Sequence, residues 1–150
     1  MPAFLRALLL AGGLALAGFA RGEVIDIDNG ELARLTQNGV PVIDIRLPAE
    51  WEATGIIAGS RLATFFDERG QSDPAAWLKK IKPYAKPDRP VIVVCRTGRR
   101  SLAVSNFLSR EAGYATVYNL KAGITGWIED KRPVAPAAPA IAACRSAGGC

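Results

Sequence analysis

The stretch from Val91 to Leu108 reads VIVVCRTGRRSLAVSNFL, and it decides the fold. Four apolar β-branched residues run into Cys95, as in a central parallel strand that is covered on both faces. Three arginines follow within five positions, and the residues from Ser101 onward have the apolar spacing of an amphipathic helix. The stretch therefore predicts a buried strand, a basic loop and a helix.

The flanking sequence repeats this alternation of strands and helices. Further strands are expected at 24–28, 42–45, 60–66 and 116–120. Helices are expected after the cap residue Asp28, at 47–55, at 74–85 behind the cap residue Asp73, at 101–113 and at 122–130. Strands that alternate with helices predict an α/β domain with a mostly parallel central sheet of about five strands.

Cys95 ends the central strand, and ligands of open α/β sheets bind beyond the carboxyl ends of the strands. The N–H groups of the loop and of the helix N-terminus form a cradle for an anion, which Gly98 helps to close. Such surroundings, with Arg96, Arg99 and Arg100 nearby, lower the pKa of a thiol. Cys95 is therefore predicted to be a thiolate nucleophile that needs no general base.

Two simpler interpretations of the loop stay open: Cys95 is an inert buried cysteine, or the loop binds an anion without turnover. The chain has no histidine, which excludes Cys-His pairs, Ser-His-Asp triads and most zinc sites. We expect no metal and no other cofactor.

The first 20 residues have the layout of a secretory signal peptide, with Arg6 before an apolar run from Ala7 to Ala20. This run is shorter than a membrane span, so a periplasmic or secreted protein is expected, with an N-terminal membrane anchor as the alternative. Cleavage after Ala20 lowers the net charge from +5 to about +4. The excess of basic residues favours anionic ligands, but their scatter argues against nucleic acid.

Three segments together resemble the single-domain rhodanese family of sulfurtransferases: Val42–Ser60, Val91–Ser101 and Asn119–Trp127. The resemblance covers about residues 23–134 and implies the three-layer rhodanese fold. Two positions depart from the family pattern. Ile56 stands where the family usually has histidine, and Ala122 replaces the first glycine of a pair.

The resemblance implies that Cys95 takes up sulfane sulfur as a persulfide. It assigns binding of the sulfur donor to Arg96, Thr97, Gly98, Arg99, Arg100 and Ser101. Asp44 and Arg46 either brace the site or form a structural ion pair or a turn contact. Cys95 and Arg100 are separated by four residues. Related phosphatases have one residue more, so phosphatase activity is disfavoured.

Residues 135–150 are rich in alanine, proline and glycine, and a flexible tail is expected from about Pro133. The tail carries Cys144 and Cys150, for which a small disulfide loop is the favoured interpretation. The alternative is that one of them receives sulfur from Cys95 or resolves it as a disulfide.

The expected function is that of an exported sulfurtransferase, which moves sulfur from thiosulfate or a similar anionic donor through a Cys95 persulfide. The acceptor is expected to be cyanide or a thiol, including a protein thiol. The alternative is a non-enzymatic sulfur carrier or a redox or sulfur sensor.

Overall fold

The computed structural model describes residues 22–150, so the predicted signal peptide at 1–20 lies outside the described residues. The strands are β1 (Glu23–Ile27), β2 (Val42–Asp44), β3 (Arg61–Leu62), β4 (Val91–Val94) and β5 (Thr116–Leu120). The helices are α1 (Asn29–Gln37), α2 (Pro48–Thr54), α3 (Pro74–Ile81), α4 (Arg99–Arg110), α5 (Gly123–Glu129) and α6 (Ala138–Ser146).

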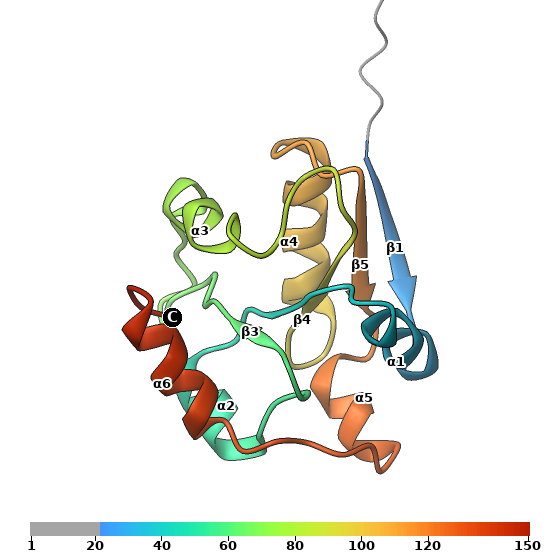
Figure 1. Ribbon diagram of the computed structural model, residues 1–150, viewed down its shortest axis with the longest axis vertical. Coiled ribbons are helices and arrows are strands. Elements are labelled where there is room, and N and C mark those ends of the chain that lie inside the picture. The colour runs from blue at the N-terminus through green and yellow to red at the C-terminus, as the bar shows by residue number, and fades with distance from the viewer. Residues whose placement is uncertain (1–21) are drawn as a thin grey trace, which may run out of the picture.

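The five strands form one parallel sheet in the order β1-β5-β4-β2-β3 (Figure 1). Strand β4 lies in the middle, and every residue in it is buried. The continuous apolar run of the sequence is thus explained by a strand that is covered on both faces. The predicted α/β class and the mostly parallel five-strand sheet are confirmed.

Successive side chains of β4 point to opposite faces of the sheet, and this alternation divides the core. Val93 and Cys95 pack in one cluster with residues of α3 and α4. Ile92 and Val94 pack in a second cluster with residues of α1 and α5. The sheet therefore lies between two helical layers, which is the three-layer arrangement that the resemblance implies.

The predicted caps are present where helices begin. Asp28 Oδ1 accepts a hydrogen bond from the N–H of Glu31 (2.8 Å), and Asp73 Oδ1 accepts one from Ala76 (3.0 Å). Helix α4 begins at Arg99, two residues before the predicted start at Ser101. The arginines of the loop therefore extend into the first turn of the helix.

The predicted strand at 60–66 is shorter in the structure, where β3 has only two residues. Beyond β3, single hydrogen bonds from Ala63 N to Asp44 O and from Phe65 N to Ile45 O continue along β2. On its outer side, Thr64 N donates to the carbonyl of Cys150 (2.8 Å). The outer edge of the sheet is therefore covered by the C-terminal residues.

The prediction of a flexible tail is wrong. Ala135 forms an antiparallel bridge with Ile56, and helix α6 follows along the β3 edge of the sheet (Figure 1). Ala137 and Ile141 are buried against Trp51, Ile56 and other apolar residues. The tail supplies little apolar bulk itself, and the folded domain provides the large side chains against which its small residues pack.

Ile56, at the position where the family usually has histidine, is buried in this third apolar cluster (3% exposed). A histidine there would place a polar ring against α6, at a cost unless it found a hydrogen-bond partner. The departure at Ile56 is thus matched by the helix that covers it.

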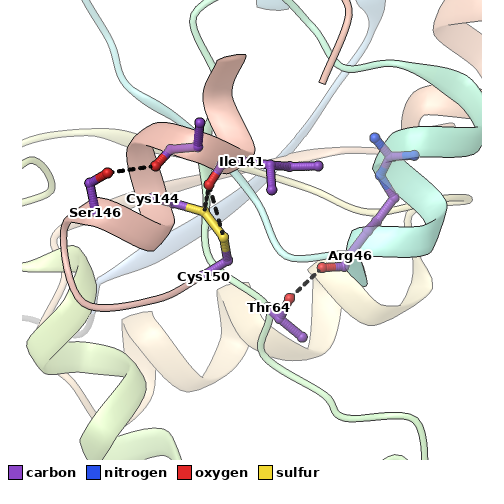
Figure 2. Close-up of a disulfide and its surroundings, with 7 residues drawn as sticks. Arg46, Thr64, Ile141, Cys144, Ser146 and Cys150 are labelled. Atoms are coloured by element: carbon purple, nitrogen blue, oxygen red, sulfur yellow. Dashed lines mark hydrogen bonds between the residues drawn. A yellow bond between two sulfur atoms is a disulfide. The ribbon is translucent and has the colours of Figure 1, made fainter. Parts of the chain in front are cut away.

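Figure 2 shows that Cys144 and Cys150 form a disulfide, which is the pairing that the sequence favoured. The bond closes the C-terminal end of α6 onto the last residues of the chain. Cys95 is a free, buried cysteine. Among residues 22–150, no helix has both the length and the apolar character needed to cross a membrane.

Candidate active site

Cys95 lies directly after β4, with its side chain fully buried. Its Sγ accepts a hydrogen bond from the backbone N–H of Gly98 (3.2 Å). Gly98 has a left-handed conformation (φ +92°), and a Cβ there would overlap the carbonyl group of Lys121. Only glycine fits this turn, which aims a backbone N–H at the sulfur. The sulfur is therefore held beneath a tight loop.

The start of helix α5 contacts the loop and fixes its conformation. The carbonyl of Arg96 accepts a hydrogen bond from Thr125 N (3.0 Å), and a Cβ at Gly123 (φ +60°) would overlap that same carbonyl. Ala122 has φ −92°, which requires no glycine. The departure at Ala122 therefore leaves the close contact intact, because Gly123 is the residue that makes it.

Ser101 lies in the first turn of α4, fully buried beside the thiol. Its Oγ is 3.3 Å from Cys95 Sγ, 3.1 Å from the Gly98 carbonyl oxygen and 2.6 Å from Asn119 Oδ1. A hydroxyl has one proton, and the shortest of these contacts directs it to Asn119. In this state, the Gly98 N–H is thus the donor that remains for the sulfur.

Asn119 is held in its orientation by a second hydrogen bond. Its Nδ2 donates to Asp26 Oδ1 (2.8 Å), so its Oδ1 faces Ser101 and can only accept. The sequence prediction gave Asn119 no role in the site. The available signal was a polar residue within β5, where buried apolar residues were expected.

A shallow hollow lies over the loop, which we call the site hollow. It is lined by Leu47, Glu50, Phe66, Arg96, Thr97, Arg99, Arg100 and Ala103. Arg96, Thr97 and Arg99 are exposed. Among residues 22–150, neither Arg96 nor Arg99 forms a salt bridge. Their guanidinium groups are therefore available to an anion.

Arg100 differs from the other two arginines, because it binds Glu50 of helix α2. Its two terminal nitrogens donate to the two carboxylate oxygens of Glu50 at 2.9 and 2.6 Å. The hydrogen bond to Glu50 raises the pKa of Arg100, and partial burial opposes this. Burial works to raise the pKa of Glu50, but the hydrogen bonds from Arg100 and from Leu47 N hold it below its ordinary value. The pair is therefore charged at neutral pH.

The sequence prediction assigned no partner to Arg100. The available signal was the acidic-aromatic pair Glu50-Trp51, which belongs to the segment that carries the family resemblance. The net positive charge over the loop comes from Arg96 and Arg99, since the charge of Arg100 is balanced.

Asp44 and Arg46 form a fully buried ion pair at the end of β2, with Nη2 to Oδ2 at 2.7 Å. Arg46 also donates to Thr54 Oγ1 (2.8 Å) and to the carbonyl of Gly55 (2.9 Å), at the end of helix α2. The pair therefore holds the helix that carries Glu50. Outside the pair, the side chain of Arg46 donates to residues of α2 and to Gly55 at its end, and to no residue of the Cys95 loop.

Thus the structure places the predicted loop residues 95–101 around one buried sulfur. The Cys144–Cys150 disulfide lies beside β3, away from the hollow that these residues line. The fold and the loop define a class of α/β proteins in which a cysteine follows a central strand and is surrounded by loop amides and arginines.

Comparisons with known proteins agree with this class. The family model described as Rhodanese-like domain matches residues 28–130. The chain is 31% identical to the protein YibN of Escherichia coli strain K12, over 85% of this chain and 84% of that protein. It is 26% identical to Thiosulfate sulfurtransferase 18 of Arabidopsis thaliana, over 75% of this chain and 84% of that protein.

Solved structures share the fold. The crystal structure of a rhodanese-related protein from Thermoplasma volcanium matches with a TM-score of 0.56 and 28% identity, over 74% of this chain and 97% of that one. The chain therefore belongs to the family of rhodanese-like domains.

Proposed function

We propose that this protein is a sulfurtransferase that carries sulfane sulfur as a persulfide on Cys95. The observation that carries the proposal is the position of Cys95 Sγ, which accepts the Gly98 N–H next to the N-terminus of α4. Loop amides and a helix N-terminus stabilise a thiolate, which is the reactive form of cysteine. The similarity to Thiosulfate sulfurtransferase 18 supports this reaction class.

The proposed reaction has two displacement steps. The Cys95 thiolate attacks the outer sulfur of thiosulfate; a Cys95–sulfur bond forms, the sulfur–sulfur bond of thiosulfate breaks, and sulfite leaves with the electron pair. Cyanide or a thiolate then attacks the terminal sulfur of the persulfide, and the Cys95 thiolate leaves. Neither step needs a proton at Cys95, so a chain without histidine can carry out both.

Arg96 and Arg99 are proposed to bind the anionic donor, because their side chains are exposed over the loop without salt-bridge partners among residues 22–150. We expect Arg99→Gln to raise the KM for thiosulfate about three- to tenfold with a smaller change in kcat. Arg110→Gln, at the other end of α4, is the matched control and should leave the KM unchanged. Equal KM values for the two variants would contradict this role of Arg99.

Export to the periplasm or the cell exterior is part of the proposal. It is supported by the apolar N-terminal segment and by the Cys144–Cys150 disulfide, since disulfides persist in oxidising compartments. Determining the N-terminal residue of the protein purified from its native host tests this directly. A mature chain that begins near Arg21 is expected, and a chain that keeps residues 1–20 would indicate the N-terminal anchor instead.

The central test is mass spectrometry of the protein after incubation with thiosulfate. A gain of about 32 Da, the mass of one sulfur atom, is expected on the peptide that contains Cys95. Cyanide should remove the added mass and yield thiocyanate. If Cys95→Ala gains the same mass, or if the wild-type protein gains none, the proposal is wrong.

A sulfur carrier is the second candidate function, and the complete burial of Cys95 favours it. In that function, the buried persulfide would be protected from small acceptors until a partner protein opened the loop. Steady-state thiocyanate production separates the two functions. Repeated turnover supports the enzyme, whereas formation of one persulfide per chain without turnover supports the carrier.

A further inference from the structure

A second, more enclosed hollow lies where helix α6 covers the β3 edge of the sheet, and we call it the edge hollow. Its volume is about 170 Å³, and its lining includes Ser60, Arg61, Lys80, Tyr84, Ala140 and Cys144. The edge hollow and the site hollow share no lining residue. Because a cavity of about 150 Å³ holds one benzene ring, the edge hollow is large enough for a small organic molecule.

The polar groups of the edge hollow suit an anion. Arg61 lies over the ring of Tyr84, 5.4 Å from its centroid, and Lys80 is exposed at the rim. Within residues 22–150, neither cation has a salt-bridge partner. Ser60 is buried (7% exposed), and among residues 22–150 its Oγ has no hydrogen-bond partner.

One lining residue of the edge hollow is chemically reactive, because Cys144 forms the disulfide with Cys150. Its partner Cys150 lines a neighbouring hollow together with Thr64 and Phe65, and Lys80 lines both hollows. Thiol–disulfide exchange proceeds when a thiolate attacks one sulfur and the other sulfur leaves. A thiol in the edge hollow is therefore expected to attack Cys144 and to release Cys150.

The surroundings of the disulfide can receive a released thiol. The carbonyl oxygen of Ile141 lies 3.4 Å from Cys144 Sγ and 3.8 Å from Cys150 Sγ (Figure 2). A disulfide sulfur has no proton, but a thiol at either position can donate one to this oxygen.

We propose that the edge hollow binds a small anionic thiol and presents its sulfur to Cys144. The thiolate forms a bond to Cys144 Sγ, the Cys144–Cys150 bond breaks, and the electron pair leaves on Cys150 Sγ, which takes a proton from water. One disulfide replaces another, so no further oxidant or reductant is consumed. The product is a mixed disulfide on Cys144.

A short series of contacts connects Cys150 with the residues that line the site hollow. The carbonyl of Cys150 accepts the Thr64 N–H (2.8 Å), and Thr64 Oγ1 donates to the carbonyl of Arg46 (2.8 Å; Figure 2). Phe66, two residues further along, lines the site hollow. The mixed disulfide thus removes the covalent tether on Cys150, the residue whose carbonyl holds Thr64 next to this wall of the active site.

The test compares three small thiols of similar size with the oxidised full-length mature protein at low salt: 3-mercaptopropionate (anionic), 2-mercaptoethanol (neutral) and cysteamine (cationic). Rate constants are taken per thiolate, and adducts are located by peptide mapping. The anionic probe should react about tenfold faster than the cationic one, with the adduct on Cys144, and added salt should reduce the difference.

Arg61→Gln is expected to slow the reaction with 3-mercaptopropionate about threefold or more and to leave the reaction with 2-mercaptoethanol unchanged. Arg110→Gln is the control for the same loss of charge elsewhere on the surface. Equal rates for the three probes, an adduct on Cys150, or equal effects of the two substitutions would each overturn the proposal. Cys95 takes no part in this exchange. The thiol test at Cys144 can therefore fail while the test for sulfur transfer at Cys95 succeeds, and the reverse also holds.

Discussion

Replacing Asp44 by alanine should destabilise the protein more than most single substitutions do. The structure buries Arg46 completely, and Asp44 supplies the carboxylate that balances its charge. The substitution removes the hydrogen bonds from Arg46 Nε and Nη2 to that carboxylate and leaves a charged guanidinium inside the protein. Losing one partner of a buried ion pair costs about 3–5 kcal/mol. That is a large fraction of a typical unfolding free energy of about 5–15 kcal/mol.

A second variant separates the loss of charge balance from the loss of packing. Asp44→Leu combined with Arg46→Met removes both charges and keeps apolar volume. Because the desolvation penalty disappears with the charges, the double variant should be at least about 2 kcal/mol more stable than Asp44→Ala. The carbonyl of Gly55 loses the Arg46 donor and keeps only the Thr54 hydroxyl, so some destabilisation relative to the wild type remains.

The measurement is urea-induced unfolding of the oxidised protein, followed by tryptophan fluorescence and extrapolated linearly to zero urea. If Asp44→Ala does not fold, Asp44→Asn keeps one carbonyl acceptor and allows the comparison to be made. A loss of unfolding free energy below about 1 kcal/mol for Asp44→Ala would refute the reasoning, because a buried unpaired charge destabilises a protein by more than this. A double variant less stable than Asp44→Ala would refute it as well.

Three further changes test the loop. Gly98→Ala should destabilise the protein by more than about 2 kcal/mol in urea unfolding, because backbone strain adds to overlap with a carbonyl group, whereas Gly39→Ala has an open environment and should cost only about 1–2 kcal/mol of strain. Glu50→Gln should lower stability by up to about 1 kcal/mol at neutral pH. The lowered pKa of Glu50 adds stability above the unfolded-state pKa of about 4.3, and this is lost as the pH falls through the folded-state pKa, so the two proteins should converge in acid. Ser101→Ala should slow the alkylation of Cys95 at neutral pH, because the Ser101 hydroxyl lies 3.3 Å from Cys95 Sγ and can donate to a thiolate; an unchanged rate would contradict this role and leave the proton on Asn119.

The parallel sheet and the order of strands and helices along the chain could be predicted from the sequence, because a buried strand leaves an apolar run that is local in the chain. Strand β5 was predicted at 116–120, the bounds that the structure shows. The position of Cys95 followed from the same signal, since a parallel strand places its last residue at the ligand-binding edge. The strands and the position of Cys95 depend on short-range patterns, which a single sequence is enough to show.

The contacts that complete the site could not be predicted in the same way, because they join distant parts of the chain. Glu50 meets Arg100 across 50 residues, and Asn119 meets Asp26 across 93 residues. No local pattern pairs one acidic residue with one of three neighbouring arginines. Helix α6 was missed for a similar reason, since its small residues pack only because large partners are already in place.

The packing of helix α6 also determines where this domain can be cut. The family model ends at residue 130, before the bridge at Ala135 and the whole of α6. A recombinant fragment designed on that boundary would leave Trp51, Ile56 and Leu62 facing water as one apolar patch. Such a fragment should self-associate or precipitate on expression, although it would contain every residue of the Cys95 loop.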